Sequence, residues 1–384
     1  MILKRQIQND IIHRISSASP DNRKVIVIYG PRQVGKTTLV KEILSVIELE
    51  KEYFNCDYLD VQNAFSYENA GNYGNIVKNL KLVVLDEAQR INNIGMVLKI
   101  LHDEFPQLQI IATGSSSFEL SGKINEPLTG RKIIYHLFPL SYQELSVTLN
   151  KIETRRLTDR ILRFGSYPSV ILGDDNLALE NLKEIASSYL FKDIFAFMQL
   201  KKPELLLDLL KLLSFQVSSE VSYTELANHL KTDQTVIQRY IQLLEDNFII
   251  FRLPALRKNL RNEVGKTRKV YFWDTGIRNI LIQNMNPVDF RDDLGKLWEN
   301  FCLSERMKFL NYSRNDMVNK YFWRTYDQKE IDYIEEKNGQ YAAYEMKWSS
   351  KKNKKLPGEF SNSYFPKEFL TVNPDNFDQI LFND

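Results

Sequence analysis

The chain contains the stretch GPRQVGKT at residues 30–37, which fits the phosphate-binding loop pattern G-x-x-x-x-G-K-[ST]. An apolar, β-branched run at 25–28 precedes this loop, and a helix-forming run at 36–44 follows it. The order predicts a strand, a glycine loop whose backbone N–H groups surround phosphates, and a helix whose N-terminus adds positive partial charge. A chance glycine turn would not need both flanking elements. The chain is therefore expected to bind a nucleoside triphosphate.

The residues of this loop have separate expected tasks. Lys36 is expected to reach the β- and γ-phosphates, and the Thr37 hydroxyl is expected to hold Mg²⁺. The predicted nucleotide contacts are Gly30, Pro31, Arg32, Gln33, Val34, Gly35, Lys36, Thr37 and Thr38.

Composition limits the class of protein. The 384 residues are 43% hydrophobic and 26% charged, which is ordinary globular usage and favours two or three domains. The net charge of +2 restricts any nucleic-acid surface to a local patch. Cys56 and Cys302 are isolated, which suits a reducing compartment. Because neither a signal peptide nor an apolar run of about 18 residues occurs, we expect a cytoplasmic protein without a membrane partner.

A second motif follows the apolar run Leu82–Leu85. The run ends in Asp86 and Glu87, and ligands of open α/β sheets bind beyond the carboxyl ends of strands. Asp86 is expected to organise the metal ion, and Glu87 to direct the attacking water. Alone, such an acidic pair would be read as a solvated turn, but it occurs downstream of a phosphate loop.

Three further residues are candidates in the same region. A strand at 109–112 precedes Thr113 and Ser115, whose hydroxyls could sense the γ-phosphate or could simply cap a helix. Arg131 could stabilise transferred charge, in cis or across a subunit contact, although a surface salt bridge is the commoner role of a lone arginine.

Five segments in order resemble prokaryotic P-loop ATPases of the AAA type, in the signal-transduction-ATPase-like branch. They are GPRQVGKTT, LVVLDEAQ, ATGSSSFEL, LTGR and FPLSYQEL. The segments 164–168 and 189–194 resemble the lid motif and a following block of that group. The resemblance implies ATP as the nucleotide, Pro168 near the base, and a carboxyl-terminal domain long catalogued as of unknown function.

The middle of the chain predicts a winged helix-turn-helix. Helices are expected near 205–213, 222–230 and 234–246, followed by strands at 248–251 and 270–273. The third helix should present polar side chains suited to DNA: Gln234, Thr235, Gln238, Arg239 and Gln242. The connection between the strands should form a basic patch with one acid, Glu263: Arg252, Arg257, Lys258, Arg261, Lys266, Arg268 and Lys269. Basic patches are also ordinary solvated surface, and winged helices attached to P-loop ATPases also serve as lids or protein contacts.

The carboxyl-terminal region contains a predicted hairpin at 330–347. Asn338-Gly339 between two alternating runs indicates a type I′ turn, which places Lys337 opposite Gln340. Counting back places Asp332 opposite Glu345 and Glu330 opposite Lys347, all on one face. Opposed carboxylates repel unless a cation such as Mg²⁺ neutralises them. The alternative is an amphipathic hairpin with its charges in water.

This arrangement resembles the restriction-endonuclease-like superfamily. The resemblance implies that Glu299, Asp332 and Glu345 hold a metal ion and that Lys347 serves in catalysis.

The predicted fold class is a multidomain α/β protein. A P-loop NTPase core with a parallel sheet (1–150) precedes a helical lid (151–202), a winged helix (203–285) and a restriction-endonuclease-like α/β domain (286–384). The expected function is Mg²⁺-dependent ATP hydrolysis that gates nucleic-acid handling or cleavage. Two alternatives stay open: a partner-sensing switch with an inactive nuclease-like scaffold, and a DNA-binding regulator. The expected partners are nucleic acid, another protein, or further copies of the chain.

Overall fold

The computed structural model describes residues 3–115, 124, 127–147, 149–187, 203–257, 268–315, 317–350 and 355–383. The chain divides into two compact units. The first unit comprises residues 1–140 and 246–248, and the second unit comprises 141–245 and 249–384.

The first unit contains a five-stranded parallel sheet in the order β2-β3-β4-β1-β5. Its strands are β1 (Val25–Tyr29), β2 (Lys51–Asn55), β3 (Leu82–Asp86), β4 (Gln109–Gly114) and β5 (Lys132–His136). The strands β1, β3 and β4 were predicted from apolar runs. The edge strand β2 was not predicted, because its sequence KEYFN carries two charged residues at exposed positions.

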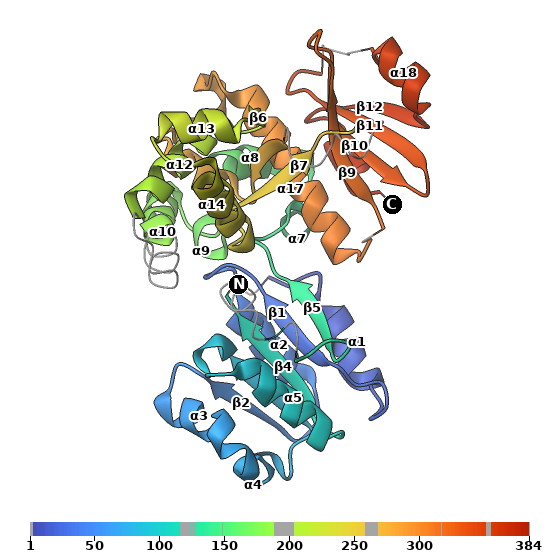
Figure 1. Ribbon diagram of the computed structural model, residues 1–384. Helices are drawn as coiled ribbons and strands as arrows, with labels where there is room; N and C mark the ends of the chain where they lie inside the picture. Colours follow the sequence, from blue (N-terminus) through green and yellow to red (C-terminus); the bar gives the residue numbers. More distant parts are fainter. Residues whose placement is uncertain are drawn as a thin grey trace. The chain divides into compact units, whose positions relative to one another are not determined.

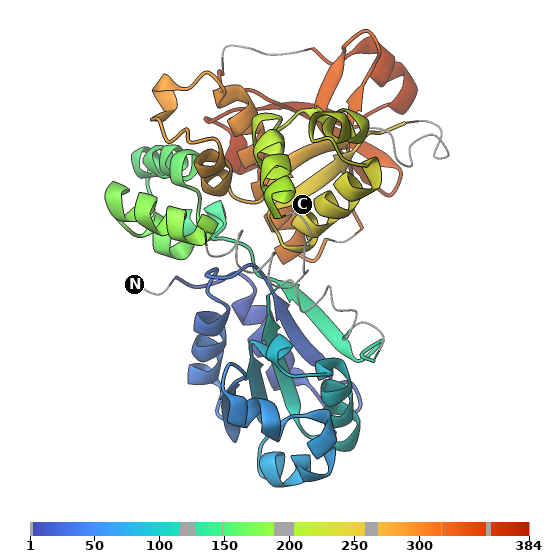
Figure 2. The ribbon, with the colours of Figure 1, turned by 60° about the vertical axis from the view of Figure 1, so that its left-hand side comes forward.

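Helices lie on both sides of this sheet (Figures 1 and 2). Every residue of the central strand β1 is buried, as expected for a parallel strand covered on both faces. One face packs against Val97, Leu98 and Leu101 of α5. The helical segments are α1 (Gln8–Ser17), α2 (Lys36–Val46), α3 (Leu59–Ala64), η1 (Tyr67–Asn72), α4 (Tyr73–Val77), η2 (Ala88–Arg90) and α5 (Ile94–Glu104).

The second unit begins with α7 (Tyr142–Ser146), and helices follow in the region 151–202 where a lid was predicted. These are α8 (Lys151–Phe164), α9 (Pro168–Ile171) and α10 (Asp175–Ser187), and α16 (Thr275–Leu281) packs against α8. The approach of α16 to α8 is close, because a Cβ atom at Gly276 would lie 1.9 Å from the Phe164 carbonyl oxygen. The block at 189–194 lies outside the described residues.

Three helices and a three-stranded antiparallel sheet follow. They are α12 (Pro203–Phe215), β6 (Glu220–Val221), α13 (Tyr223–His229), α14 (Gln234–Asp246), β7 (Ile250–Pro254) and β8 (Arg268–Phe272), with strand order β6-β8-β7. The helices and the last two strands occur in the predicted order. The short strand β6 was not predicted. The assignment of these elements to a winged helix-turn-helix stays a prediction.

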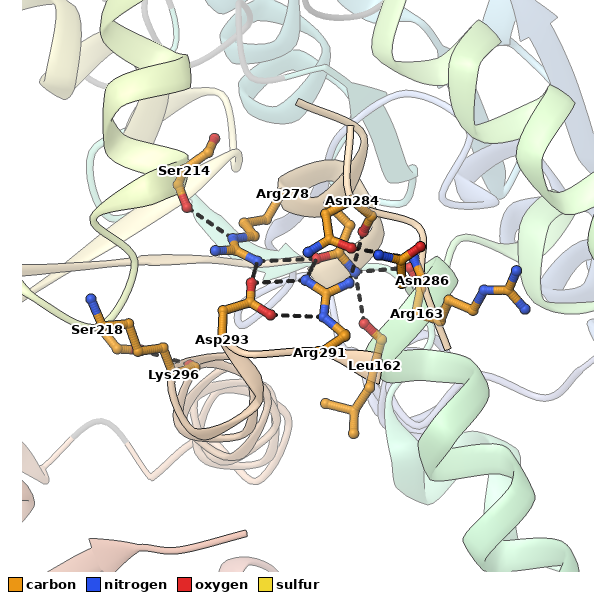
Figure 3. A network of polar contacts seen from close by, with 11 residues as sticks. Leu162, Arg163, Ser214, Ser218, Arg278, Asn284, Asn286, Arg291, Asp293 and Lys296 are labelled. Atoms are coloured by element: carbon orange, nitrogen blue, oxygen red, sulfur yellow. Dashed lines mark hydrogen bonds and ion pairs between the residues drawn. The ribbon is translucent and has the colours of Figure 1, made fainter. Parts of the chain in front are cut away.

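A buried polar network joins several of these helices (Figure 3). Asn279 on α16 donates to the carbonyl oxygens of Leu162 and Arg163 at the end of α8, at 2.8 and 2.9 Å. Arg291 contacts both oxygens of Asp293 at 2.8 Å and donates to the Asn279 side chain at 3.0 Å. The network therefore ties α8, α16 and the segment before α17 (Leu294–Tyr312) together.

The carboxyl-terminal region is a long buried helix beside a four-stranded sheet of order β12-β11-β10-β9. Its elements are η4 (Val288–Phe290), α17 (Leu294–Tyr312), β9 (Asn319–Arg324), β10 (Glu330–Lys337), β11 (Gln340–Met346), α18 (Gly358–Tyr364), β12 (Glu368–Val372) and α19 (Phe377–Leu381). The segment after β7 reaches this sheet, because the Leu256 N–H donates to the Phe322 carbonyl oxygen of β9 at 2.7 Å.

The predicted hairpin is confirmed over residues 333–344. The predicted pairs Asp332–Glu345 and Glu330–Lys347 lie beyond these residues and stay predictions. Lys337 pairs with Gln340, the register continues to Tyr333 opposite Tyr344, and Asn338 and Gly339 both have the positive φ of a type I′ turn. The pairing of β10 with β9 shifts register between Ile331 and Ile334, so the irregularity lies at residues 332–333.

Among the described residues, no helix combines the length and apolar composition that crossing a membrane requires.

Candidate nucleotide site and carboxyl-terminal acid cluster

The phosphate loop lies between β1 and α2, as the sequence predicted. Gly35 is the N-cap of α2 with φ 94°, and Gln33 also has positive φ at 61°. A Cβ atom at Gly30 would lie 2.1 Å from the carbonyl oxygen of Leu137, so only glycine fits there. The loop backbone is therefore held in a conformation that depends on glycine at both ends.

Lys36 lies inside the loop. Its side chain is only 4% exposed, and its ammonium donates to the carbonyl oxygens of Gly30 and Pro31 at 2.9 and 3.0 Å. These contacts hold the charge at the loop, where phosphate oxygens of a nucleotide could replace the two carbonyl groups.

Asp86 at the end of β3 meets the loop directly. Thr37 Oγ1 donates to Asp86 Oδ2 at 2.7 Å, and the Tyr53 hydroxyl donates to the same oxygen at 2.5 Å. Burial, together with the hydrogen bond to Asp86, raises the pKa of Tyr53 above its ordinary value, so the hydroxyl stays a donor. Tyr53 was missed in the sequence because β2 carries no motif.

Thr113 connects the two predicted acids. Its hydroxyl donates to Asp86 Oδ1, and the Glu87 backbone N–H donates to Thr113 Oγ1 at 3.1 Å. Glu87 has φ 53°, a left-handed conformation that is uncommon for this residue type and often found at functional sites. Ser115 is buried directly after β4, and Thr113 contacts both acids through its hydroxyl.

A cleft of about 420 Å³ opens over these groups. It is lined by Arg32, Gln33, Thr37, Lys41, Tyr53, Asn55, Asp57, Asp86, Glu87 and Arg90. The structure thus brings the phosphate loop, the predicted metal carboxylate and the predicted water-directing acid together at the carboxyl ends of the strands.

Arg131 does not join this site in the same chain, so that prediction is corrected. Its carbonyl accepts from the N–H of Val25, the first residue of β1, and its guanidinium binds Asp103 at 2.8 Å. The phosphate loop follows the other end of β1, five residues and about 17 Å away. A contribution across a subunit contact stays a prediction. Pro168 begins α9 in the second unit, and its role near the base also stays a prediction.

Arg5 is a positioning residue that the sequence did not single out. Its buried guanidinium donates to the carbonyl oxygen of Val34 in the loop and to that of Phe138 after β5, both at 2.7 Å. Its place in a polar amino-terminal stretch offered no signal, because both partners are distant in sequence.

Comparison with known families agrees with this geometry for the amino-terminal part. Residues 22–146 match the family described as AAA domain. Residues 22–146 have the fold of AAA-type P-loop ATPases. Residues 155–288 and 294–380 match two families described as domains of unknown function, DUF8612 and DUF4143.

Sequence similarity to other proteins extends beyond residues 22–146. An uncharacterized protein of Mycobacterium tuberculosis is 26% identical over 332 residues, which cover 85% of this chain and 70% of that protein. An uncharacterized protein of Methanocaldococcus jannaschii is 24% identical and covers 94% and 85% of the two chains. Among solved structures, the Walker-type ATPase paby2304 of Pyrococcus abyssi has a TM-score of 0.48 at 17% identity and covers 73% of this chain and 96% of its own. Because that TM-score is below 0.5, the ATPase assignment rests on the match of residues 22–146.

Outside the ATPase domain, the predicted acids of the carboxyl-terminal region gather in one cluster. Asp332 and Glu345 are 6% and 0% exposed, so the alternative of a hairpin with these charges in water is wrong. Asp332 Oδ2 accepts from the Met346 N–H at 2.8 Å, and Lys347 lies 2.7 Å from Glu345 and 3.9 Å from Asp332. Burial, reinforced by the charges of Glu299 and Glu345, raises the pKa of Asp332 to about 8.

A lysine that was assigned to the basic patch occupies this cluster. Lys269 on β8 is 1% exposed, and its ammonium lies 3.0 Å from Glu299, 2.5 Å from Glu330 and 3.9 Å from Asp332. Burial alone would lower the pKa of Lys269, but the neighbouring carboxylates raise it above its ordinary value. Lys269 therefore carries its charge inside the protein.

The predicted metal centre of Glu299, Asp332 and Glu345 does not fit this geometry. In the part of the chain that the structure describes, no three Asp, Glu, His or Cys side chains are arranged to hold a metal ion. The Tyr271 hydroxyl also donates to the Glu299 oxygen that Lys269 contacts, at 2.7 Å. The physical reason is the ammonium, which already supplies the positive charge that a metal ion was expected to supply.

The basic patch of the middle region is corrected as well. Lys269 is buried, and Arg252 ion-pairs with Glu245 and donates to the Tyr223 hydroxyl. Lys258, Arg261, Glu263 and Lys266 lie outside the described residues. By contrast, the predicted polar face of α14 is exposed as expected at Gln234, Thr235, Gln238, Arg239 and Gln242.

Proposed function

We propose that the chain binds ATP with Mg²⁺ and hydrolyses it at the phosphate loop. The observation that carries the proposal is the meeting of Thr37 and Asp86 at 2.7 Å, with Glu87 adjacent, in a cleft beside Lys36. A hydroxyl and a carboxylate in contact are the two protein ligands that a P-loop site offers to Mg²⁺.

The residues would divide the work as follows. Lys36 leaves the Gly30 and Pro31 carbonyl groups and donates to phosphate oxygens, while the loop N–H groups bind the remaining oxygens. Glu87 orients the attacking water, and Thr113 holds Glu87 and Asp86 in a fixed relation. Bound Mg²⁺ would supply charge neutralisation on the transferred phosphoryl group.

The test compares ATP turnover of the wild type with Lys36→Ala and Glu87→Gln. Lys36→Ala should abolish nucleotide binding or turnover, and Glu87→Gln should keep binding while slowing hydrolysis by ~100-fold or more, the range of a lost general-base or water-positioning group. Lys78→Ala, an exposed lysine of the same unit, is the control. Unaltered hydrolysis in Lys36→Ala would contradict the site.

For the second unit we propose nucleic-acid handling through the exposed face of α14, coupled to the nucleotide state. The supporting observation is that glutamine, threonine and arginine side chains gather on one exposed face of a helix that follows a second helix after a short turn. These side-chain types suit base edges and phosphates in a major groove.

Duplex DNA binding by Arg239→Glu tests this second proposal. The affinity should fall and the salt dependence should weaken, because a phosphate contact is removed. Arg156→Glu, an exposed arginine on α8, provides a matched charge change. Equal affinity of wild type and Arg239→Glu would exclude α14 as the contact surface.

We further propose that the carboxyl-terminal domain serves as a nuclease-like scaffold within a nucleotide switch that senses a partner, rather than as a cleaving enzyme. The Lys269 ion pairs with Glu299 and Glu330 favour this alternative over cleavage, which would need a metal ion in the acid cluster.

Cleavage assays decide between an inactive nuclease-like scaffold and an active nuclease. Single- and double-stranded DNA and RNA would be incubated with Mg²⁺ or Mn²⁺, with and without ATP, using wild type and Glu345→Ala. We expect no cleavage that depends on Glu345. Cleavage lost in the variant would restore the nuclease interpretation and overturn the scaffold.

A further inference from the structure

The acid cluster of the carboxyl-terminal domain needs positive charge. Glu299 comes from α17, Glu330 and Asp332 come from β10, and Glu345 comes from β11. Three of these side chains are buried, and buried carboxylates without a partner are strongly disfavoured. Lys347 pairs with Glu345 at 2.7 Å, so Glu299 and Glu330 need a second cation.

The ammonium of Lys269 meets the requirements for that cation. It contacts Glu299 and Glu330 at hydrogen-bond distance and lies within 3.9 Å of Asp332, while its side chain is almost fully buried. The ring of Phe322 lies 5.5 Å from the same ammonium and closes one side. Two carboxylates on different elements, Glu299 on α17 and Glu330 on β10, thus lie within hydrogen-bond distance of the ammonium, and Asp332 adds a nearby negative charge.

We propose that Lys269 is the resident counter-cation of this cluster, in the place of a divalent metal ion. The wild-type cluster then binds neither Mg²⁺ nor Mn²⁺, and removal of the Lys269 charge turns the same carboxylates into a divalent-cation site. The proposal is independent of ATP hydrolysis, which takes place at residues of the other unit.

Lys269 also connects two sheets of the second unit. Lys269 belongs to β8 of the three-stranded sheet, whereas its acidic partners belong to α17 and β10. The same sheet contributes Tyr271, whose hydroxyl binds Glu299. A metal ion would neutralise the acids without holding β8, so the lysine also joins the two parts of the second unit.

The test measures Mn²⁺ binding to the full-length chain without nucleotide, by the loss of the free-ion signal in electron paramagnetic resonance. All samples carry Asp86→Asn, which removes the metal carboxylate of the ATPase site. The four chains compared have Lys269 unchanged, Lys269→Met, Lys269→Arg, and Lys269→Met combined with Glu345→Gln.

We expect Mn²⁺ binding only in Lys269→Met, with the gain lost when Glu345→Gln is added. Lys269→Arg should behave like the unchanged chain because it keeps the positive charge. A folded Lys269→Met chain that binds no more Mn²⁺ than the unchanged chain would overturn the proposal.

Thermal unfolding provides the second readout. The midpoint of Lys269→Met should fall without metal and rise again with Mn²⁺, whereas that of the unchanged chain should not respond to Mn²⁺.

If Lys269→Met does not fold, the unchanged Lys269 chain is compared with its Glu345→Gln variant. Equal Mn²⁺ binding by these two chains supports the proposal, and a loss of bound Mn²⁺ in Glu345→Gln refutes it. Neither result depends on ATP turnover, so failure here is distinguishable from failure of the ATPase assignment.

Discussion

At the scale of single residues, the two charged centres of this protein differ in what neutralises their acids. Asp86 is held by hydroxyl donors, Thr37, Tyr53 and Thr113, which carry no charge. Glu299 is held by the ammonium of Lys269. A carboxylate bound only by hydroxyl groups keeps its charge available for a metal ion, whereas one paired with an ammonium does not.

Tyr53→Phe tests the contribution of the hydroxyl that binds Asp86. Partners that orient a metal-binding carboxylate typically account for 10- to 100-fold in metal affinity. We therefore expect the Mg²⁺ concentration for half-maximal ATP turnover to rise by about 10-fold. Tyr58→Phe, at an exposed position after the same strand, should leave it unchanged. An unaltered Mg²⁺ dependence in Tyr53→Phe would show that the contact does not position Asp86.

Asp332 makes stability depend on pH. Its pKa is raised from 3.8 in the unfolded chain to about 8 in the folded one, so the folded state binds the proton more tightly. This contribution to stability is fully present below about pH 4 and is lost as the pH rises through about 8. A difference of one in pKa between the folded and unfolded chain corresponds to about 1.4 kcal/mol of free energy.

Urea unfolding at pH 6 and pH 9 measures this effect. The wild type should lose more stability between the two pH values than Asp332→Asn, which cannot titrate. Asp327→Asn, at an exposed position in the β9–β10 turn, should lose as much as the wild type. Equal losses for the wild type and Asp332→Asn would contradict the raised pKa.

At the scale of elements, α16 packs closely against the end of α8 in the second unit. Asn279 satisfies two carbonyl groups at the end of α8, and Gly276 allows the helix to approach. The end of a helix leaves carbonyl groups without helical partners, and here a side chain from another helix supplies the donor.

Gly276→Ala should be strongly destabilising for this reason. The new Cβ atom would lie 1.9 Å from the Phe164 carbonyl oxygen, so the two helices must separate. Overpacking of this kind costs about 3 kcal/mol or more, measurable by urea unfolding. Gly295→Ala on α17, where nothing lies within 4 Å of the new atom, should cost nothing. Similar stability of the two variants would show that α16 can shift without loss.

At the scale of the whole molecule, the nucleotide cleft is built entirely from the first unit and the acid cluster entirely from the second. In the complete chain, binding of a ligand to one unit can therefore be measured as a gain in the stability of that unit.

ATP with Mg²⁺ should raise the thermal midpoint of the first unit. At 100 times the dissociation constant, binding contributes about 2.7 kcal/mol. The shift should disappear in Lys36→Ala, and GTP should give a smaller shift if the site selects adenine. An equal shift with GTP would contradict adenine selectivity, since the loop itself reads phosphates rather than bases.

The sequence by itself determined the phosphate loop, the order of its flanking strand and helix, and the register of the hairpin over residues 333–344. These features depend on residues that are neighbours along the chain: glycines at 30 and 35, and the Asn338-Gly339 turn. Local backbone geometry and alternation suffice to predict them.

Only the tertiary structure decided which side chains meet across the fold. Tyr53 reaches Asp86 across 33 residues, and Lys269 reaches Glu299 across 30, so neither partner is visible in a local pattern. The same holds for Arg131, which parallel strand pairing puts at the edge of the sheet opposite the phosphate loop. The physical reason is that charge neutralisation in a protein interior is decided by which elements pack together, and residues distant in the chain supply it.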